Sequence, residues 1–204
     1  MEFPKRKSIR LKGYDYGQNG AYYVTICTKD KAHLFGEIIA VGADLVSARA
    51  QLNYAVQMIE KVFLETVQSF DNIIADKYVV MPNHFHCILV ISRAGSVTRA
   101  GYVSRADTRS APTTDTVAMK TVSAVVRAFK SKTTLEYIKG VKSGVLPPFD
   151  KQVWQRNYYE HVIRDESDYQ TKWKYIDENP AKWVEDEYYC VSDSGSGAGM
   201  TWVF

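Results

Sequence analysis

Two runs of apolar and β-branched residues lie on either side of the dipeptide Pro82-Asn83. The first run is "NIIADKYVVM", residues 72–81, and the second is "HFHCILVI", residues 84–91. Such runs favour strands, and a link of two residues between them is typical of an antiparallel hairpin. We therefore expect two adjacent strands here, and the fold must contain a sheet.

Further elements follow from residue type and periodicity. Residues 20–28, "GAYYVTICT", favour a strand because they are rich in β-branched and aromatic side chains. Apolar residues recur at helical spacing in 51–70 and in 116–138, and 165–180 begins with capping chemistry and stops at a proline. A last strand is expected around 151–163.

The order strand, helix, strand, strand, helix, strand, helix predicts an α+β protein. We expect a ferredoxin-like sandwich with a central antiparallel sheet, followed by an additional C-terminal helix. A chain of 204 residues, 46% of them apolar, can bury such a core in one domain. We assign residues 1–190 to this domain, with surface insertions at about 41–50 and 93–115, and 191–204 to a loosely attached Gly/Ser-rich tail.

Composition bears mainly on location. The formal net charge of +3 permits a polyanionic partner without requiring one. The three cysteines are too few and too irregularly spaced for a disulfide framework, which fits a reducing cytoplasm. Neither a signal-peptide pattern nor a run of about 18 apolar residues occurs, so we expect no export and no membrane partner.

The second run carries two of the chain's four histidines, one residue apart. Side chains alternate across a strand, so His84 and His86 share one face while Phe85 and Cys87 share the other. Two neutral imidazoles on a rigid strand can hold a divalent cation if another element supplies a third ligand. The alternative is a hydrogen-bonded pair on a half-buried sheet. A structural zinc site is disfavoured because it needs four ligands and Cys87 faces away.

Several motifs together resemble one family. "MPNHFHCILVI" resembles the His-hydrophobe-His (HUH) motif of single-stranded DNA transposases and relaxases, in the "MPNHxH" form of the IS200-like Y1 tyrosine transposases. Further matches are "SIRLKGYDY" with "GAYYVTICT", "FKSKTT", and "VWQRNYYEHVIRDESDYQTKWKYIDENPAKW". The resemblance covers nearly the whole chain apart from the two insertions and the tail. It indicates the branch of REP-associated tyrosine transposases.

The resemblance also selects a nucleophile among 14 tyrosines. In this family the nucleophile lies on a late helix, and "KYIDENP" matches the segment that carries it, which implies that the C-terminal helix holds the nucleophile and that Tyr175 is the catalytic residue. The adjacent Tyr158 and Tyr159 are its rivals, and we interpret them as core or DNA-stacking groups.

The third metal ligand is the next question. Asn179 lies four residues after the selected tyrosine and thus on the same helical face, which makes it the candidate by geometry and by resemblance. Its place before Pro180 biases it away from helical dihedrals. Asp177, Glu178 and His161 are the alternatives.

The resemblance implies a metal-dependent enzyme. It would cleave single-stranded DNA at palindromic, REP-like hairpins and transfer the strand through a 5′-phosphotyrosine intermediate. Mg²⁺ or Mn²⁺, held by His84, His86 and Asn179, would neutralise a non-bridging phosphate oxygen. A phenol suits reversible transfer because its pKa, about 10, is well below that of an alcohol. Related enzymes act as dimers or as monomers, and we favour a monomer.

Basic residues in two places are candidate DNA contacts. The N-terminal cluster is interleaved with tyrosines, as in phosphate-binding arms, and a second set lies on the second predicted helix and before the last strand. Each is also compatible with an ordinary solvated charge. The candidates are Lys5, Arg6, Lys7, Arg10, Lys12, Arg127, Lys130, Lys132 and Arg156.

Two other functions compete with this interpretation. A domesticated hairpin-binding protein without strand-transfer activity would keep the DNA contacts, but the presence of both histidines and of Tyr175 argues against lost chemistry. A histidine-triad nucleotide hydrolase needs a further histidine two residues on, where this chain has Ile88.

Overall fold

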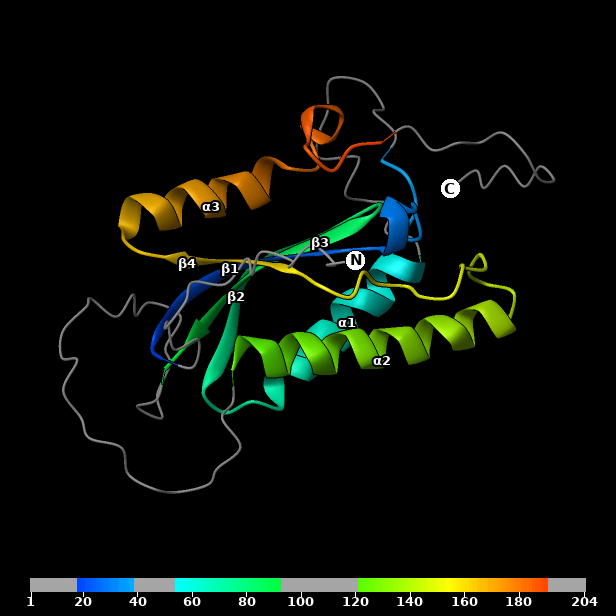
Figure 1. Ribbon diagram of the computed structural model, residues 1–204, viewed down its shortest axis with the longest axis horizontal. Helices are drawn as coiled ribbons and strands as arrows, with labels where there is room; N and C mark the ends of the chain where they lie inside the picture. The colour runs from blue at the N-terminus through cyan, green and yellow to red at the C-terminus, as the bar shows by residue number, and fades with distance from the viewer. Residues whose placement is uncertain (1–17, 39–53, 93–120, 191–204) are drawn as a thin grey trace, which may run out of the picture.

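The computed structural model describes residues 18–38, 54–92 and 121–190 (Figure 1). These residues form one four-stranded sheet whose order in space is β2-β3-β1-β4, with every neighbouring pair antiparallel. The strands are β1 (Gly20–Cys27), β2 (Ile73–Met81), β3 (His84–Ile91) and β4 (Tyr159–Ile163). The expected hairpin is confirmed, because Met81 pairs with His84 across the Pro82-Asn83 link.

Helices cover both faces of this sheet (Figure 1). α1 (Tyr54–Gln68) and α2 (Val122–Lys142) lie on one face, and α3 (Glu166–Glu178) lies on the other against β2 and β3. Short 3₁₀ helices follow β1 and α3, at Lys29–Lys31 and Trp183–Glu185. With β1 and β3 central, the strand–helix–strand–strand–helix–strand order is ferredoxin-like, so the expected α+β fold is confirmed.

Strand alternation gives each side of the sheet its own core. Toward α1 and α2 the chain buries a group of aromatic rings, in which the ring centre of Phe85 lies 4.8 Å from that of Phe63 and 5.0 Å from that of Phe129. Full burial of such a side chain contributes about 1.5–3 kcal/mol. Toward α3 a smaller apolar cluster contains Ile88 and Ile176. The polar candidate residues lie beside this smaller cluster, at the end of the sheet near the β2-β3 turn.

Two elements differ from expectation at their ends. α2 continues to Lys142 because the chain leaves helical geometry only after Ser143, at Gly144, whose φ of 75° is left-handed. The strand expected around 151–163 is ordered as β4 only from Tyr159. The residues before it use their carbonyls elsewhere, since the ammonium of Lys130 donates to three of them.

Gly140 on the buried side of α2 provides a test of this packing. A Cβ at this position would lie 2.5 Å from Cδ1 and 2.8 Å from Cγ of Leu146, so the whole leucine side chain would have to move. We expect Gly140→Ala to lower the free energy of unfolding by about 1–2 kcal/mol, because overpacking outweighs the better helix propensity of alanine. Urea denaturation measures this change. The exposed Lys142→Ala serves as the control with little effect, and a Gly140→Ala protein at least as stable as wild type would contradict the packing.

The expected insertions and tail lie wholly or mostly in residues 39–53, 93–120 and 191–204, outside the described part of the chain. Their assignment, and with it the domain boundary at 190, stays a prediction. Among the described helices, none combines the length and the apolar character needed to cross a membrane.

Candidate metal and nucleophile site

His84 and His86 begin β3, directly after the β2-β3 turn. Both are fully buried on the face that α3 covers, and their ring centres lie 4.4 Å apart. Phe85 and Cys87 belong to the core on the opposite side, as strand alternation predicts. The strand therefore presents two adjacent imidazoles toward α3.

The ring of His84 is held in one tautomer. Its Nδ1 lies 2.7 Å from Oδ1 of Asn83. The Asn83 amide nitrogen donates to the Tyr188 carbonyl at 2.9 Å, which fixes the orientation of the amide and turns its oxygen to the ring. Because that oxygen can only accept, Nδ1 of His84 carries the proton, and Nε2 presents a lone pair.

The ring of His86 is oriented by hydroxyl groups of β1. Its Nδ1 lies 2.8 Å from the hydroxyl of Tyr23 and 2.9 Å from that of Thr25. Burial lowers the pKa of His86 well below its ordinary value, and the neighbouring His84 lowers it further. Burial lowers the pKa of His84 as well. Both imidazoles are therefore neutral near pH 7, which is the state that binds a metal.

α3 is fixed across this face at both of its ends. It begins after Asp165, whose carboxylate accepts a hydrogen bond from the backbone nitrogen of Asp168 at 2.9 Å, as an N-cap does. Near its end Asp177 forms an ion pair of 2.6 Å with Lys77 of β2. The same lysine lies 3.9 Å from the ring centre of Trp173. These contacts determine which side of the helix faces the histidines.

Tyr175 and Asn179 occupy that side, one turn apart. The ring centre of Tyr175 lies 5.3 Å from that of His86. Asn179 is buried and has right-handed helical dihedrals, φ −56° and ψ −44°, although Pro180 follows it. The expected bias against helical geometry is thus overcome at this residue, and both side chains share one face.

Asp186 connects these side chains, and the sequence analysis missed it. Its Oδ2 accepts hydrogen bonds from the hydroxyl of Tyr175 at 2.6 Å and from Nδ2 of Asn179 at 2.5 Å. Ligand atoms of Asp186, His84 and His86 all lie within 4.8 Å of one another. The structure therefore adds a carboxylate to the predicted set.

The available signal for Asp186 is weak. It is the middle one of three consecutive acidic residues, Glu185 to Glu187. Their spacing does not tell which one faces the site. The 3₁₀ helix after α3 turns the Asp186 carboxylate toward the site, and the backbone nitrogen of Tyr188 holds it there by donating to Oδ1 of Asp186 at 2.7 Å.

The donor set fits a divalent cation. At this site, three buried polar atoms have no assigned hydrogen-bond partner among the described residues, namely Nε2 of His84, Nε2 of His86 and Oδ1 of Asn179. An unpaired buried polar group costs about 1–3 kcal/mol, so three at one place indicate an absent partner that they share. Two imidazole nitrogens, an amide oxygen and the carboxylate of Asp186 form a nitrogen and oxygen donor set of the kind that binds divalent cations.

The alternative ligands on α3 have other partners. Asp177 forms an ion pair with Lys77. Glu178 forms ion pairs with Lys174 at 3.6 Å and with Lys182 at 2.8 Å. Neither belongs to the group of potential metal ligands found in the described chain.

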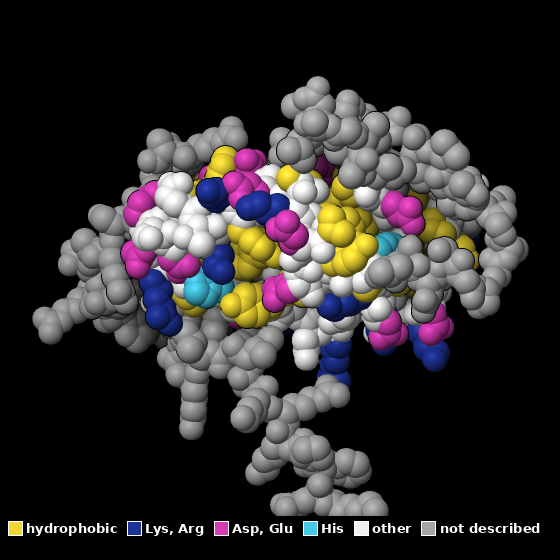
Figure 2. Space-filling view, turned by 90° about the horizontal axis from the view of Figure 1, so that it is seen from above, with side chains coloured by type: hydrophobic (Ala, Val, Ile, Leu, Met, Phe, Trp, Pro, Cys, Tyr) yellow, Lys and Arg dark blue, Asp and Glu magenta, His cyan; other side chains and the backbone are white. Residues whose placement is uncertain are grey.

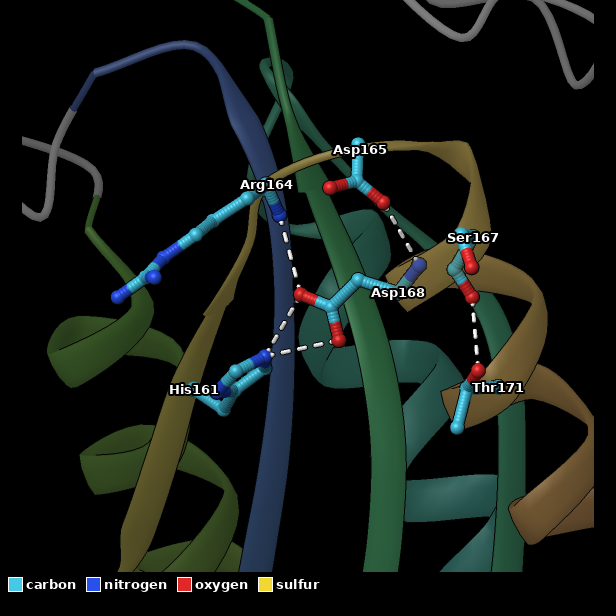
Figure 3. Close-up of polar contacts among 6 residues, drawn as sticks. All are labelled: His161, Arg164, Asp165, Ser167, Asp168 and Thr171. Carbon is cyan, nitrogen blue, oxygen red and sulfur yellow. Dashed lines mark hydrogen bonds and ion pairs between the residues drawn. The ribbon is translucent and has the colours of Figure 1, made fainter.

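His161, the remaining alternative, has a different partner (Figure 3). Its Nε2 lies 3.0 and 2.8 Å from the two carboxylate oxygens of Asp168. The same carboxylate accepts the backbone nitrogen of Arg164 at 3.1 Å. His161 therefore links β4 to the start of α3 and is not part of the candidate metal site.

A small cavity borders Tyr175. It has a volume of about 130 Å³ and is lined by Tyr175, Glu178, Asn179, Lys182, Glu185 and Asp186. The ring of Tyr188 covers the histidines, with its centre 4.8 Å from that of His84 and 5.8 Å from that of His86. Tyr175 and two candidate ligands thus border solvent through this cavity.

The rival tyrosines, Tyr158 and Tyr159, have other surroundings than Tyr175. The hydroxyl of Tyr158 donates to Glu160 at 3.0 Å and lies 3.3 Å from that of Ser123, and its ring packs on the α1/α2 core. Tyr159 is 45% exposed, and its ring centre lies 6.4 Å from that of Tyr23. Of the three candidates, only Tyr175 bonds to Asp186.

The predicted DNA contacts on α2 lie on the other face of the sheet from the histidines (Figure 1). Arg127, Lys132 and Arg156 are exposed. The ammonium of Lys130 donates to the carbonyls of Gln155 at 2.8 Å and of Asn157 at 3.0 Å, and burial lowers its pKa to about 8. The N-terminal candidates, Lys5, Arg6, Lys7, Arg10 and Lys12, lie outside the described residues.

Fold and site together define an α+β protein with a two-histidine candidate metal centre facing a helix-borne tyrosine. An uncharacterized protein of Haemophilus influenzae is 36% identical over 185 residues, which cover 90% of this chain and 93% of that protein. The chain belongs to the same family as this Haemophilus protein. No protein-family model matches it.

Two solved structures are also similar. One is a REP-associated tyrosine transposase bound to a REP hairpin, with 18% identity, coverage of 96% of each chain and a TM-score of 0.47. The other is a candidate transposase from Deinococcus radiodurans, with 13% identity, coverage of 83% of this chain and 95% of that one, and a TM-score of 0.42.

Proposed function

We propose that the protein cleaves single-stranded DNA at palindromic hairpins and transfers the cut strand through a 5′-phosphotyrosine at Tyr175. The observation that carries this proposal is the convergence on Asp186. The hydroxyl of Tyr175 and the unpartnered ligand atoms of His84, His86 and Asn179 lie around this one carboxylate. The motif resemblance supplies the class of DNA.

The reaction would form one bond and break another. The oxygen of Tyr175 attacks phosphorus, and the bond from phosphorus to the 3′ oxygen breaks, leaving a 5′-phosphotyrosine. The phenolic proton passes to Oδ2 of Asp186, which already accepts its hydrogen bond, and the departing 3′ oxygen takes up a proton from solvent water. Attack by another 3′-OH reverses the step and joins two strands. A bound divalent ion would neutralise a non-bridging phosphate oxygen.

The phenol of Tyr175 holds its proton in this arrangement. Burial raises the pKa of its phenol above the ordinary value, and the hydrogen bond to Asp186 together with the charge of that carboxylate raises it further. The phenol is therefore protonated at neutral pH. Attack requires that its proton leave toward Asp186 as the new bond forms.

Two further proposals concern partners. Tyr175 and both histidines come from one chain, which supports a site that a monomer completes. The exposed Arg127, Lys132 and Arg156 are suited to DNA backbone contacts away from the site, whereas Lys130 is engaged with carbonyls.

The test uses DNA hairpins with randomised single-stranded flanks, incubated with the full chain and Mn²⁺ or Mg²⁺. We expect a covalent protein–DNA adduct on a denaturing gel, and mass spectrometry of its tryptic peptides should place the modification on Tyr175. If the protein binds hairpins but forms no adduct with any pool, the proposed cleavage is overturned and the alternative function, a domesticated hairpin-binding protein, is supported. Neither binding nor an adduct would overturn both functions.

A further inference from the structure

Lys172 lies on α3 one turn before Tyr175. Its Nζ lies 5.1 Å from the ring centre of Tyr23. That ring stacks on His86 with centres 5.4 Å apart and meets the ring of Tyr175 edge-on at 6.2 Å. The ammonium of Lys172 is therefore separated from the candidate site by a single aromatic ring.

This lysine differs from others around the helix in having no anionic partner within the described part of the chain. Lys77 pairs with Asp177, and Lys174 and Lys182 both pair with Glu178. Among the described residues, no carboxylate lies within ion-pair distance of Lys172, and the nearby Asp168 is held by His161. A partly buried, unpaired ammonium beside a proposed phosphoryl-transfer site is suited to an anionic ligand.

Tyr159 lies on the same side of the sheet. Thr25 of β1 pairs with His86 on one flank and with Tyr159 on the other, so these three residues form one row across the strands. The side chain of Tyr159 is 45% exposed, and its ring meets that of Tyr23 edge-on. Figure 2 views this face of the molecule, where Lys and Arg side chains lie among hydrophobic and acidic ones.

We propose that Lys172 and Tyr159 form a nucleotide subsite for the single strand next to the scissile phosphate, with Lys172 on a phosphate and Tyr159 stacked on a base. The assignment rests on the proposed function, because it places this strand on the β4 side of the metal and nucleophile site. Tyr23 is the floor of the subsite, since its ring contacts His86, Tyr159, Tyr175 and the Lys172 ammonium.

The chemistry matches a single strand rather than a duplex. An exposed aromatic ring can stack on any unpaired base, and a lysine provides a point charge for the backbone. In a duplex the base faces are already stacked on one another, so Tyr159 would have nothing to bind. The edge strand β4 leaves the approach to this ring open, as its exposure shows.

The phosphate contact is tested with Lys172→Gln and its matched control Lys174→Gln on the outer side of the same helix. The probe is the cleaved strand recovered from the hairpin pools, labelled with a fluorophore and bound in EDTA so that no metal or chemistry contributes. We expect Lys172→Gln to weaken binding about three- to tenfold and to lower the slope of log affinity against log salt by about 0.7. Lys174→Gln should change neither. A methylphosphonate at the contacted phosphate should abolish the difference between wild type and Lys172→Gln.

The stacking contact is tested with Tyr159→Ala, Tyr159→Phe and the control Tyr54→Ala, an exposed tyrosine on α1. We expect Tyr159→Ala to weaken binding about tenfold, while Tyr159→Phe keeps the affinity because the ring is retained. An abasic residue at one position of the strand should weaken binding to wild type by the same factor of about ten. With that abasic strand, Tyr159→Ala should bind as tightly as wild type. This coupling is not expected of a residue that acts only on folding.

The outcomes separate the subsite from the proposed function. If wild type forms the adduct but Lys172→Gln and Tyr159→Ala bind like their controls, the subsite is overturned and the function stands. If no pool yields an adduct, a hairpin with a dT₁₀ flank replaces the recovered strand. If both variants bind that probe more weakly than wild type, the proposed subsite stands and the proposed cleavage activity is overturned.

Discussion

Tyr175→Phe is expected to abolish the covalent protein–DNA adduct while leaving DNA binding intact. The substitution removes the oxygen that would attack phosphorus, so adduct formation should fall by at least about a thousandfold. The fold should survive, because the hydroxyl makes one hydrogen bond at a half-buried position, worth about 1.5–3 kcal/mol at most. Denaturing gels measure the adduct, and fluorescence anisotropy with the same oligonucleotide measures binding.

Three other tyrosines are the controls. Tyr158→Phe and Tyr159→Phe should keep the adduct, since neither hydroxyl bonds to Asp186. Tyr188→Phe is the most demanding control, because its ring lies 4.8 Å from that of His84. An adduct that persists in Tyr175→Phe and disappears in one of these three would move the nucleophile there and overturn the assignment.

Some residues of the candidate site could be predicted from the sequence, and others could not. His84 and His86 were predictable because a strand repeats every two residues, so one local pattern determines which side chains share a face. Tyr175 and Asn179 were paired by helical spacing in the same way. Both arguments are local, and neither could show that α3 lies over β3.

Asp186 shows where local reasoning ends. It follows a proline and a short 3₁₀ helix, so no repeat carries from α3 to this residue. Its role depends on the chain turning back after Pro180 until a carboxylate reaches both Tyr175 and Asn179. Two neighbouring acidic residues have the same charge, and only the path of the backbone distinguishes them.

Lys130 shows what charge alone leaves undetermined. On a helix with other basic residues, it was predicted to contact a phosphate backbone. In the structure its ammonium lies under the segment before β4 and donates to three carbonyls there. A long flexible side chain can take either role, because lysine is equally able to bind an anion or the carbonyls of its own chain. Tertiary packing decides between them.

Mn²⁺ is expected to stabilise the wild-type protein and to lose this effect when either histidine of the site is removed. A ligand that binds only the folded state at 100 times its dissociation constant adds about 2.7 kcal/mol of stability. Removal of one metal-binding side chain among His84, His86 and Asn179 should weaken the affinity for the metal at least about 100-fold. The stability added by Mn²⁺ then falls to less than about 0.5 kcal/mol. The measured quantity is the change in melting temperature with and without Mn²⁺, compared within each variant.

That comparison separates metal binding from packing. His84→Ala and His86→Ala leave cavities and lower the melting temperature on their own. This loss is the same with and without Mn²⁺, so it drops out when the two melting temperatures of one variant are subtracted. His161→Ala is the matched control, because this histidine is bound by Asp168 outside the site and should keep the full increment. If the increment survives in His84→Ala and His86→Ala, or disappears in His161→Ala, the three unpartnered atoms near Asp186 do not form the metal site, and the proposed chemistry loses its electrostatic basis.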